Sequence, residues 1–261
     1  DVNDGITDPD ILERNEYILG NLSEYGQWNY TIGTQYRHYG KSSLTTLTLS
    51  RNSYNNTSEK YRNNDDSAPQ NLITSYESSE TENKLRAEHS ATRGKLRYFF
   101  GGGLESAEFT IENLSYITTS TGPIQRNYFS DIDFIKYSVF GSVSYPFFKN
   151  RLTISAGFRA DGNSYSDEMN NPLTQFSPRT GISYSLTEKW FLNAGAGVYY
   201  QLPAYTMMGY RDQNGDLINR ELGLDYITNT QLNGGVEFRP DDKTKITFEA
   251  FDKQYSDYPF S

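Results

Sequence analysis

Apolar and polar side chains alternate along most of the chain with a period of two residues. In the clearest stretch, one face carries Trp190, Leu192, Ala194, Ala196, Val198 and Tyr200, and the other carries Phe191, Asn193, Gly195, Gly197 and Tyr199. The pattern recurs in residues 28–36, 137–147 and 152–160. Successive side chains of a β-strand point to opposite faces of the sheet, so this alternation predicts strands with one apolar face.

Applied to the whole chain, the pattern predicts about ten strands. Their expected ranges are 27–37, 43–52, 82–92, 95–116, 134–147, 150–161, 173–186, 189–201, 228–239 and 244–256. The glycines at 101–103 predict a bulge or bend inside the fourth strand. No helical segment or linker interrupts the pattern, so we expect one all-β domain over residues 1–261.

The connections between the predicted strands alternate between short and long. Short turns are expected at 38–42, 93–94, 148–149, 187–188 and 240–243, and long polar segments at 53–81, 117–133, 162–172 and 202–227. In an antiparallel up-and-down sheet, this order places all tight turns at one end and all long loops at the other. Outer-membrane barrels, with short periplasmic turns and long extracellular loops, have this arrangement.

Strand length and aromatic placement favour a barrel in a membrane over a soluble sandwich. Ten residue steps from Trp190 to Tyr200 span roughly 33 Å, which at a tilt near 40° covers roughly the 25 Å apolar band of such barrels. Aromatic residues stand at both ends of this face, as at membrane interfaces. The opposite face, rich in Ser, Thr, Asn, Gly and Arg, suits a wet lumen. The sequence thus predicts a transmembrane β-barrel, with a soluble β-protein as the alternative.

Composition excludes several other classes of protein. The 261 residues include 24 Lys and Arg against 33 Asp and Glu, a formal charge of −9 that disfavours nucleic-acid binding. Without cysteine, the chain has no disulfide or thiolate metal site. Its apolar runs are only a few residues long, far below the roughly 20 that a membrane-spanning helix needs.

Several segments resemble the barrel of TonB-dependent outer-membrane receptors, in the form found in Bacteroidetes. They are residues 176–184 (FSPRTGISY), 193–205 (NAGAGVYYQLPAY) and 229–240 (NTQLNGGVEFRP), in that order. The resemblance is specific over residues 173–261, about a third of the chain. One departure is Arg220, which stands where the family usually has a proline after an asparagine.

The resemblance implies a middle part of a 22-stranded barrel, without the N-terminal plug of the family. It implies an outer-membrane receptor that imports a scarce nutrient, such as a siderophore, vitamin, glycan or peptide. The implied partners are the TonB–ExbB–ExbD complex, reached through the plug, outer-membrane lipid and, in some relatives, a surface lipoprotein; no cofactor is expected. A soluble or surface-attached β-rich ligand-binding protein is the alternative.

Candidate binding residues lie where the eighth strand enters the following loop. Tyr199 is expected to face the lumen beneath a loop that holds Tyr205, Tyr210, Arg211 and Asp212. Aromatic rings with hydroxyl groups form a stacking and hydrogen-bonding surface for a passing solute. Alternatively, these tyrosines only pack the loop on itself.

Four charged residues are expected on inward faces of the predicted strands. They are Arg159, Arg179, Glu237 and Arg239. Such groups could contact a solute or the plug, and in a closed receptor we expect the plug to be the partner. The sequence therefore predicts a charged lumen wall.

No catalytic site is predicted. The two histidines, His38 and His89, fall near the short turns, whereas an outer-membrane protease would hold its His and Asp at the opposite rim. We therefore expect a protein that is not an enzyme.

The loop after the eighth strand has a partial calcium-loop spacing. Asp212, Asn214 and Asp216 take the first, third and fifth positions, but Gly215 comes one place early and Gly223 replaces the final glutamate. The sequence therefore predicts a turn on Asn214 and Gly215 without a metal.

Overall fold

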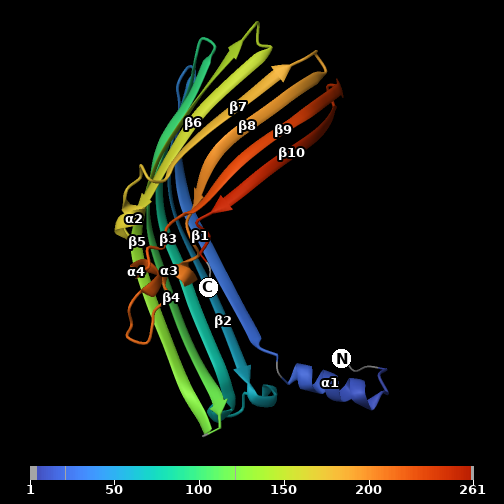
Figure 1. The fold of residues 1–261 in the computed structure, drawn as a ribbon, viewed down its shortest axis with the longest axis vertical. Helices are drawn as coiled ribbons and strands as arrows, with labels where there is room; N and C mark the ends of the chain where they lie inside the picture. The colour runs from blue at the N-terminus through green and yellow to red at the C-terminus, as the bar shows by residue number, and fades with distance from the viewer. Residues whose placement is uncertain (1–4, 21, 121, 260–261) are drawn as a thin grey trace. The chain divides into compact units, whose positions relative to one another are not determined.

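The protein is described by a computed structural model, which covers residues 5–20, 22–120 and 122–259 and contains ten strands (Figure 1). They are β1 Glu24–Tyr39, β2 Ser43–Tyr61, β3 Leu72–Arg93, β4 Leu96–Thr119, β5 Gly122–Phe147, β6 Leu152–Asn163, β7 Phe176–Ser185, β8 Trp190–Gln201, β9 Ile227–Asp241 and β10 Thr244–Ser256. They form one sheet in chain order, with β1 and β10 at its edges. The predicted all-β, up-and-down antiparallel architecture is confirmed, and over the described residues the sheet is not closed.

Two of the predicted long loops are largely strand. β2 and β3 extend so far that only residues 62–71 connect them, and β4 runs to Thr119 before β5 begins at Gly122. The prediction of a long loop at 117–133 is therefore wrong. Residues 122–133 mix polar and apolar side chains on both faces, so the alternation that marks a strand with one apolar face is missing there.

One helix precedes β1 and three short helices lie in the connections between strands, so the prediction of an uninterrupted β-pattern is also wrong. They are α1 Pro9–Leu19, α2 Asp167–Asn170, α3 Tyr205–Met208 and α4 Ile218–Glu221. α1 begins where the Asp8 carboxylate accepts a 3.0 Å hydrogen bond from the backbone nitrogen of Asp10, with a proline in the first turn. Among the described residues, no helix is both long and apolar enough to cross a membrane.

The chain divides into two compact units. The first comprises residues 1–31, 52–81 and 108–132, and the second comprises residues 32–51, 82–107 and 133–261. In the first unit, Phe109 is buried, and the buried hydroxyl groups of Ser53 and Thr81 lie 3.0 Å apart. The second unit contains all five short connections, which lie together at the upper end in Figure 1, as the sequence predicts.

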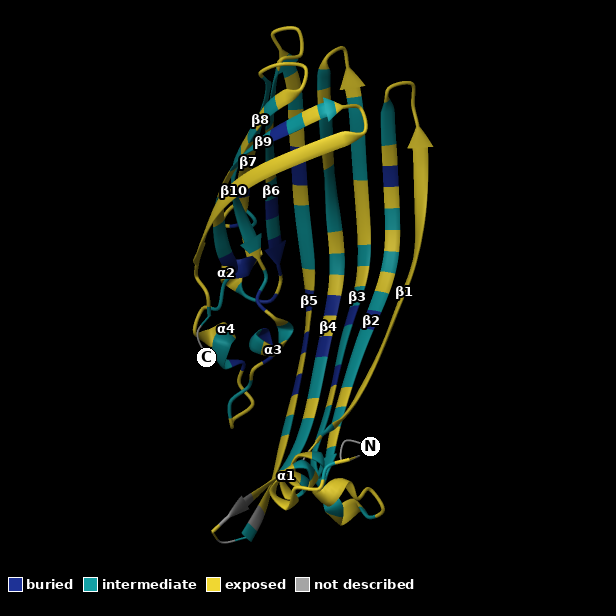
Figure 2. Ribbon diagram, turned by 90° about the vertical axis from the view of Figure 1, so that its right-hand side faces the viewer, coloured by how far each residue is buried: buried dark blue, intermediate teal, exposed yellow. Residues whose placement is uncertain are grey.

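In the second unit, the strand register separates a polar face from an apolar face. Arg179 of β7 lies opposite Gly197 of β8, and Glu237 of β9 lies opposite Phe191 of β8. On the other face, Leu192 lies opposite Val236. This apolar face is open: Val139, Leu192 and Leu232 on it are exposed, and Figure 2 shows β10 exposed along its length. An apolar face of this kind suits a hydrocarbon surrounding.

The glycines at 101–103 lie within β4, which continues through them from Leu96 to Thr119. A side-chain carbon added at Gly101 would lie 2.6 Å from the Ala87 carbonyl oxygen and 2.7 Å from the Phe140 ring. The glycine therefore makes room for a large ring on the polar face of β5.

Candidate functional site

A network of four charged side chains lies on the polar face of β3, β4 and β5. Lys136 Nζ lies 2.8 Å from Glu82 Oε1 and also contacts the Glu105 carboxylate. Lys84 Nζ lies 2.6 Å from Glu82 Oε2 and 3.4 Å from Glu105 Oε2. The two ammonium groups balance the two carboxylates, which offsets part of the free energy needed to remove these charges from water.

Tyr205, at the start of α3, joins the connection between β8 and β9 to this network. Its hydroxyl donates a 2.5 Å hydrogen bond to Glu82 Oε1 and accepts one of 2.6 Å from Lys136 Nζ. Its ring also packs edge-on against Phe134, with the centroids 5.5 Å apart. The hydroxyl predicted to bind a solute therefore anchors its own loop to the polar face.

Further hydrogen bonds fold this connection, residues 202–226, into a packed structure. The hydroxyl of Tyr165 donates to the Met208 carbonyl at 2.6 Å, and the Asn163 amide donates to the Tyr226 hydroxyl at 2.8 Å. Met208 is completely buried. Burial raises the pKa of Tyr226 to about 12, so this phenol stays protonated at neutral pH.

A cavity of about 320 Å³ opens beside the charged network. Its charged lining residues are Lys84, Arg86, Glu105, Lys136, Arg159 and Asp161, and its uncharged polar lining residues are Tyr137, Ser138, Tyr200 and Tyr226. The guanidinium of Arg159 is held by the Asp161 carboxylate, with Nη2 2.6 Å from Oδ1. The cavity offers both hydrogen-bond donors and acceptors, so it suits a polar solute or the polar side chains of another domain.

The polar face also carries the other three charged residues predicted to point inward. Arg179 lies over the Tyr199 ring, with Cζ 4.4 Å from the centroid. Glu237 is held from both sides, because Arg239 Nε lies 2.5 Å from Oε1 and Lys245 Nζ lies 2.8 Å from Oε2. The structure thus brings Tyr199 together with Arg179, and Glu237 with Arg239, as pairs along the wall.

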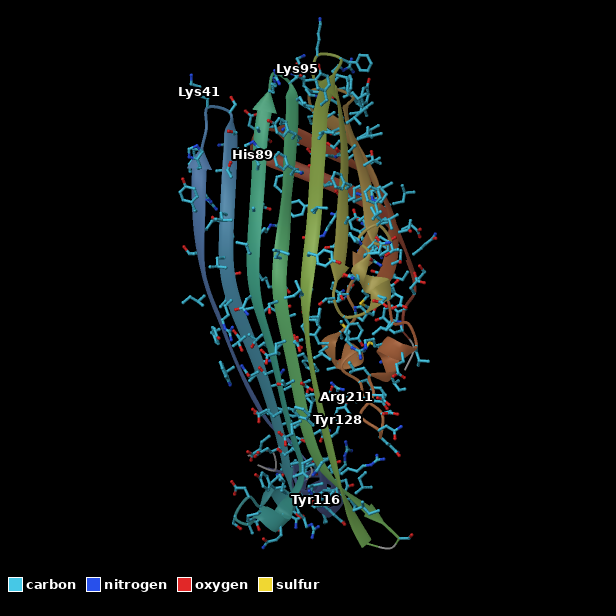
Figure 3. The ribbon with its side chains drawn as sticks, turned by 90° about the vertical axis from the view of Figure 1, so that its left-hand side faces the viewer. Lys41, His89, Lys95, Tyr116, Tyr128 and Arg211 are labelled. Atoms are coloured by element: carbon cyan, nitrogen blue, oxygen red, sulfur yellow. The ribbon has the colours of Figure 1, made fainter. Side chains whose placement is uncertain are left out.

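The predicted residues at the loop tip lie in a short hairpin, in which Figure 3 labels Arg211. Arg211 pairs with Leu217, and its guanidinium donates to the Gly215 carbonyl at 2.8 Å. Asp212 accepts hydrogen bonds from the backbone nitrogens of Asp216 and Asn214 at 3.0 and 2.8 Å, which hold the pKa of its carboxyl below the usual range. The predicted turn is present, and Tyr210 beside it is half exposed.

A metal site is not built from these residues. Within residues 5–20, 22–120 and 122–259, no three His, Asp or Glu side chains gather in a group that would hold a metal ion. His89 lies on the outward face instead, where its Nδ1 is 2.9 Å from Thr45 Oγ1 and its ring is 5.3 Å from that of Phe100.

The charged network is the part of the site that sequence reasoning missed. Glu82 and Lys84 follow the alternation of β3, and Lys136 follows that of β5, so the sequence marks each as inward-facing. Nothing in the sequence indicates that residues 54 positions apart, such as Glu82 and Lys136, meet. That meeting depends on the register of β3, β4 and β5.

Comparison with known proteins identifies the family. The family description "TonB dependent receptor-like, beta-barrel" matches residues 1–261. The chain belongs to the TonB-dependent receptor β-barrel family. It is therefore an outer-membrane protein, and the alternative of a soluble β-protein is set aside. No curated protein matches the chain significantly.

Solved structures of TonB-dependent receptors share the fold at low sequence identity. The copper transporter OprC is similar over 92% of this chain and 40% of its own, with 16% identity and a TM-score of 0.65. The pyoverdine receptor FpvA from Pseudomonas aeruginosa PAO1 is similar over 90% and 37%, with 13% identity and a TM-score of 0.65. The ferric enterobactin receptor PfeA from Pseudomonas aeruginosa is similar over 88% of this chain and 35% of its own, with 17% identity and a TM-score of 0.63. The chain thus spans 40% or less of each of these receptors.

Proposed function

We propose that the protein is an outer-membrane receptor that binds a scarce nutrient and imports it into the periplasm with energy from the TonB complex. The observation that carries the proposal is the connection 202–226, which is anchored through Tyr205 to a charged face of family barrel strands. Charged groups are stable only where water or a polar partner reaches them. A charged face on membrane-spanning strands therefore indicates a water-filled or plugged lumen.

The predicted binding residues would contact a solute at two successive levels. Tyr210, Arg211 and Asp212 lie at the loop tip, where a solute would first make contact. The second level is the polar wall, where the Arg179 guanidinium stacks on the Tyr199 ring. A solute with rings and hydrogen-bonding groups, such as a siderophore, vitamin, glycan or peptide, would find stacking and hydrogen-bonding partners at both levels.

The charged pairs on the wall suit a plug domain inside the barrel. Arg159 with Asp161 is a balanced pair, and Glu237 is shared between Arg239 and Lys245, so these groups would exchange hydrogen bonds with a polar plug surface while keeping their ion pairs. Such contacts would let the TonB complex act on the plug while the wall stays in place. The same pairing argues against catalysis, because Asp161 and Glu237 are each held by a cation and His89 contacts Thr45 and Phe100 on the outward face.

Uptake by cells that express the native protein tests the proposal. A panel of labelled solutes (a ferric siderophore, cobalamin, copper, a glycan and a peptide) is offered to these cells and to cells without the gene. We expect one class to accumulate only with the gene, and its accumulation to stop when the proton gradient or TonB is removed, while surface binding persists. Accumulation that continues without TonB would contradict the energy source, and no difference between the strains would contradict the receptor function.

Variants at the loop tip test the binding residues. Tyr210→Ala combined with Arg211→Ala is expected to weaken surface binding of the accumulated solute about tenfold or more, because a ring contact and a charged hydrogen bond are both lost. Tyr258→Phe, at an exposed tyrosine after β10, is the matched control. Unchanged binding in the double variant at equal amounts in the outer membrane would remove the loop tip from the site.

A further inference from the structure

The end of the second unit that carries the short turns is basic, although the chain as a whole is acidic. Residues 37–41, 93–97, 149–151, 188–189 and 239–245 hold eleven Lys and Arg against three acidic residues, a balance of +8 in a chain of net charge −9. The long connections of the same unit, residues 164–175 and 202–226, hold two basic and six acidic residues. The two ends therefore carry opposite charge.

Seven of these basic residues lie in the turns or on outward-facing positions next to them, and we call them the basic rim. They are Lys41, Arg93, Lys95, Lys149, Arg151, Lys189 and Lys243. All seven are exposed, and none forms an ion pair with another described residue. Figure 3 labels Lys41 and Lys95 at two of the turns. The remaining cations of this end, such as Arg97 and Lys245, belong to the polar face.

A belt of aromatic rings lies directly beside the rim on the apolar face. Trp190 stacks on Phe238 with the centroids 4.4 Å apart, and Tyr145 packs edge-on against Phe147 at 4.9 Å. The guanidinium of Arg151 lies 5.6 Å from the centre of the Tyr184 ring. Aromatic residues of membrane barrels stand at the boundary between hydrocarbon and headgroups, so the rim lies at headgroup depth.

We propose that the basic rim binds the anionic headgroups of phospholipids in the periplasmic leaflet of the outer membrane. Short turns of outer-membrane barrels face the periplasm, and a negatively charged lipid surface attracts basic residues at its edge. Each such residue is worth about a fivefold enrichment of anionic lipid at its position. The proposal rests on the outer-membrane location of the family and does not depend on nutrient import.

The distribution of the rim favours lipid over an acidic protein partner. Its residues come from all five turns, at the end of the strands that carries the aromatic belt. A protein partner would match a compact patch, whereas a lipid leaflet meets every turn of a barrel equally. The lack of ion pairs among the described residues agrees, because the counter-charges would come from the surrounding leaflet; Arg151 also donates hydrogen bonds to the Ser185 and Leu186 carbonyls, which hold its guanidinium at the strand end.

The lipid next to Trp190 reports on this contact. The native protein is reconstituted in phosphatidylcholine vesicles with phosphatidylglycerol, and a small fraction of one lipid or the other carries brominated chains. The quantity measured is tryptophan fluorescence. The contribution of Trp190 is the fluorescence of the native protein minus that of Trp190→Phe. We expect brominated phosphatidylglycerol to quench Trp190 more strongly than brominated phosphatidylcholine at the same mole fraction, and the difference to shrink at high salt.

Matched charge variants show whether the rim causes the preference. Lys189→Gln combined with Lys243→Gln removes one rim charge next to Trp190 in the chain and one from the adjacent turn between β9 and β10. The double variant is expected to reduce the enrichment several-fold, with quenching by brominated phosphatidylcholine unchanged. Arg37→Gln combined with Arg97→Gln removes the same charge from the polar face and is expected to keep the enrichment. Equal quenching by both lipids in the native protein, or equal loss in both double variants, would overturn the proposal; the first result would point to a protein partner.

Discussion

The hydroxyl of Tyr205 donates a 2.5 Å hydrogen bond to Glu82, a residue 123 positions earlier in the chain. The same hydroxyl accepts a hydrogen bond from Lys136. Three elements, β3, β5 and α3, therefore meet at one phenol. This arrangement makes the position of residues 202–226 depend on a few polar contacts, and that dependence can be measured.

Replacing Tyr205 by phenylalanine tests the anchor. Tyr205→Phe keeps the ring against Phe134 but removes two hydrogen bonds with charged groups, each worth about 1.5–3 kcal/mol. We expect amide hydrogen exchange in residues 202–226 to accelerate tenfold or more, while exchange in β8 and β9 is unchanged. Tyr258→Phe, at an exposed position, is the control and should exchange like the native protein. Unchanged exchange in Tyr205→Phe would show that other contacts hold the loop.

The raised pKa of Tyr226 predicts a loss of stability at high pH. The unfolded phenol titrates near pH 10 and the buried one at about 12, so between these values the folded protein binds more protons than the unfolded protein. The free energy of unfolding therefore falls by about 1.4 kcal/mol per pH unit through this group, after being constant below pH 10. Thermal unfolding from pH 9 to pH 12 measures the slope. Tyr226→Phe should start less stable but show a shallower slope, and equal slopes would contradict the assignment.

Two glycine variants test the packing of the polar face. Gly101→Ala places a methyl group 2.6 Å from the Ala87 carbonyl oxygen, and we expect it to destabilise the fold by about 1–3 kcal/mol. Gly181→Ala has its nearest neighbour at 4.0 Å, so this matched change should have little effect. The free energies of unfolding of the two variants are compared by urea unfolding, with the folded fraction measured from heat-sensitive migration on a gel. Equal stability of both variants would show that the backbone at Ala87 and the Phe140 ring both shift at little cost, and would contradict the tight packing at Gly101.

Residues 1–261 expressed alone should not stay monomeric. β1 and β10 each have one pairing neighbour, and every residue in them is exposed, so two long edges remain open to other chains. We expect large particles in size-exclusion chromatography with light scattering, both in detergent and without it. A folded monomer that is stable without detergent would contradict the membrane placement itself.

The sequence is most informative where one face of a strand is apolar. The alternation predicts a strand over residues 189–201, and β8 runs from Trp190 to Gln201, because over residues 192–198 every second residue is apolar and the residues between them are Asn or Gly. Over residues 122–133, β5 has polar and apolar side chains on both faces, so no alternation marks this part of the strand. Hydrophobic alternation reports which face a strand buries, so it is silent where the two faces resemble each other.

The candidate site shows the same limit at the level of single contacts. The alternation places Arg179 and Tyr199 on the same face of the sheet, and in the structure the Arg179 Cζ lies 4.4 Å from the centre of the Tyr199 ring. The role of Tyr205 as an anchor has no signal in the sequence, because it depends on Glu82 and Lys136, which only the register of distant strands brings together. Helices α3 and α4, of four residues each, are too short to leave a periodic signal.

The intact mass of the native protein, extracted from its own membranes, tests the central claim most directly. If these strands are an arc of a closed receptor barrel, the open edges at β1 and β10 are paired by further strands of the same polypeptide. We then expect a mass more than twice the 29.8 kDa of residues 1–261, in line with the 40% share of OprC that they match, and heat-sensitive migration on a gel. A mass of 29.8 kDa with heat-insensitive migration would contradict the account.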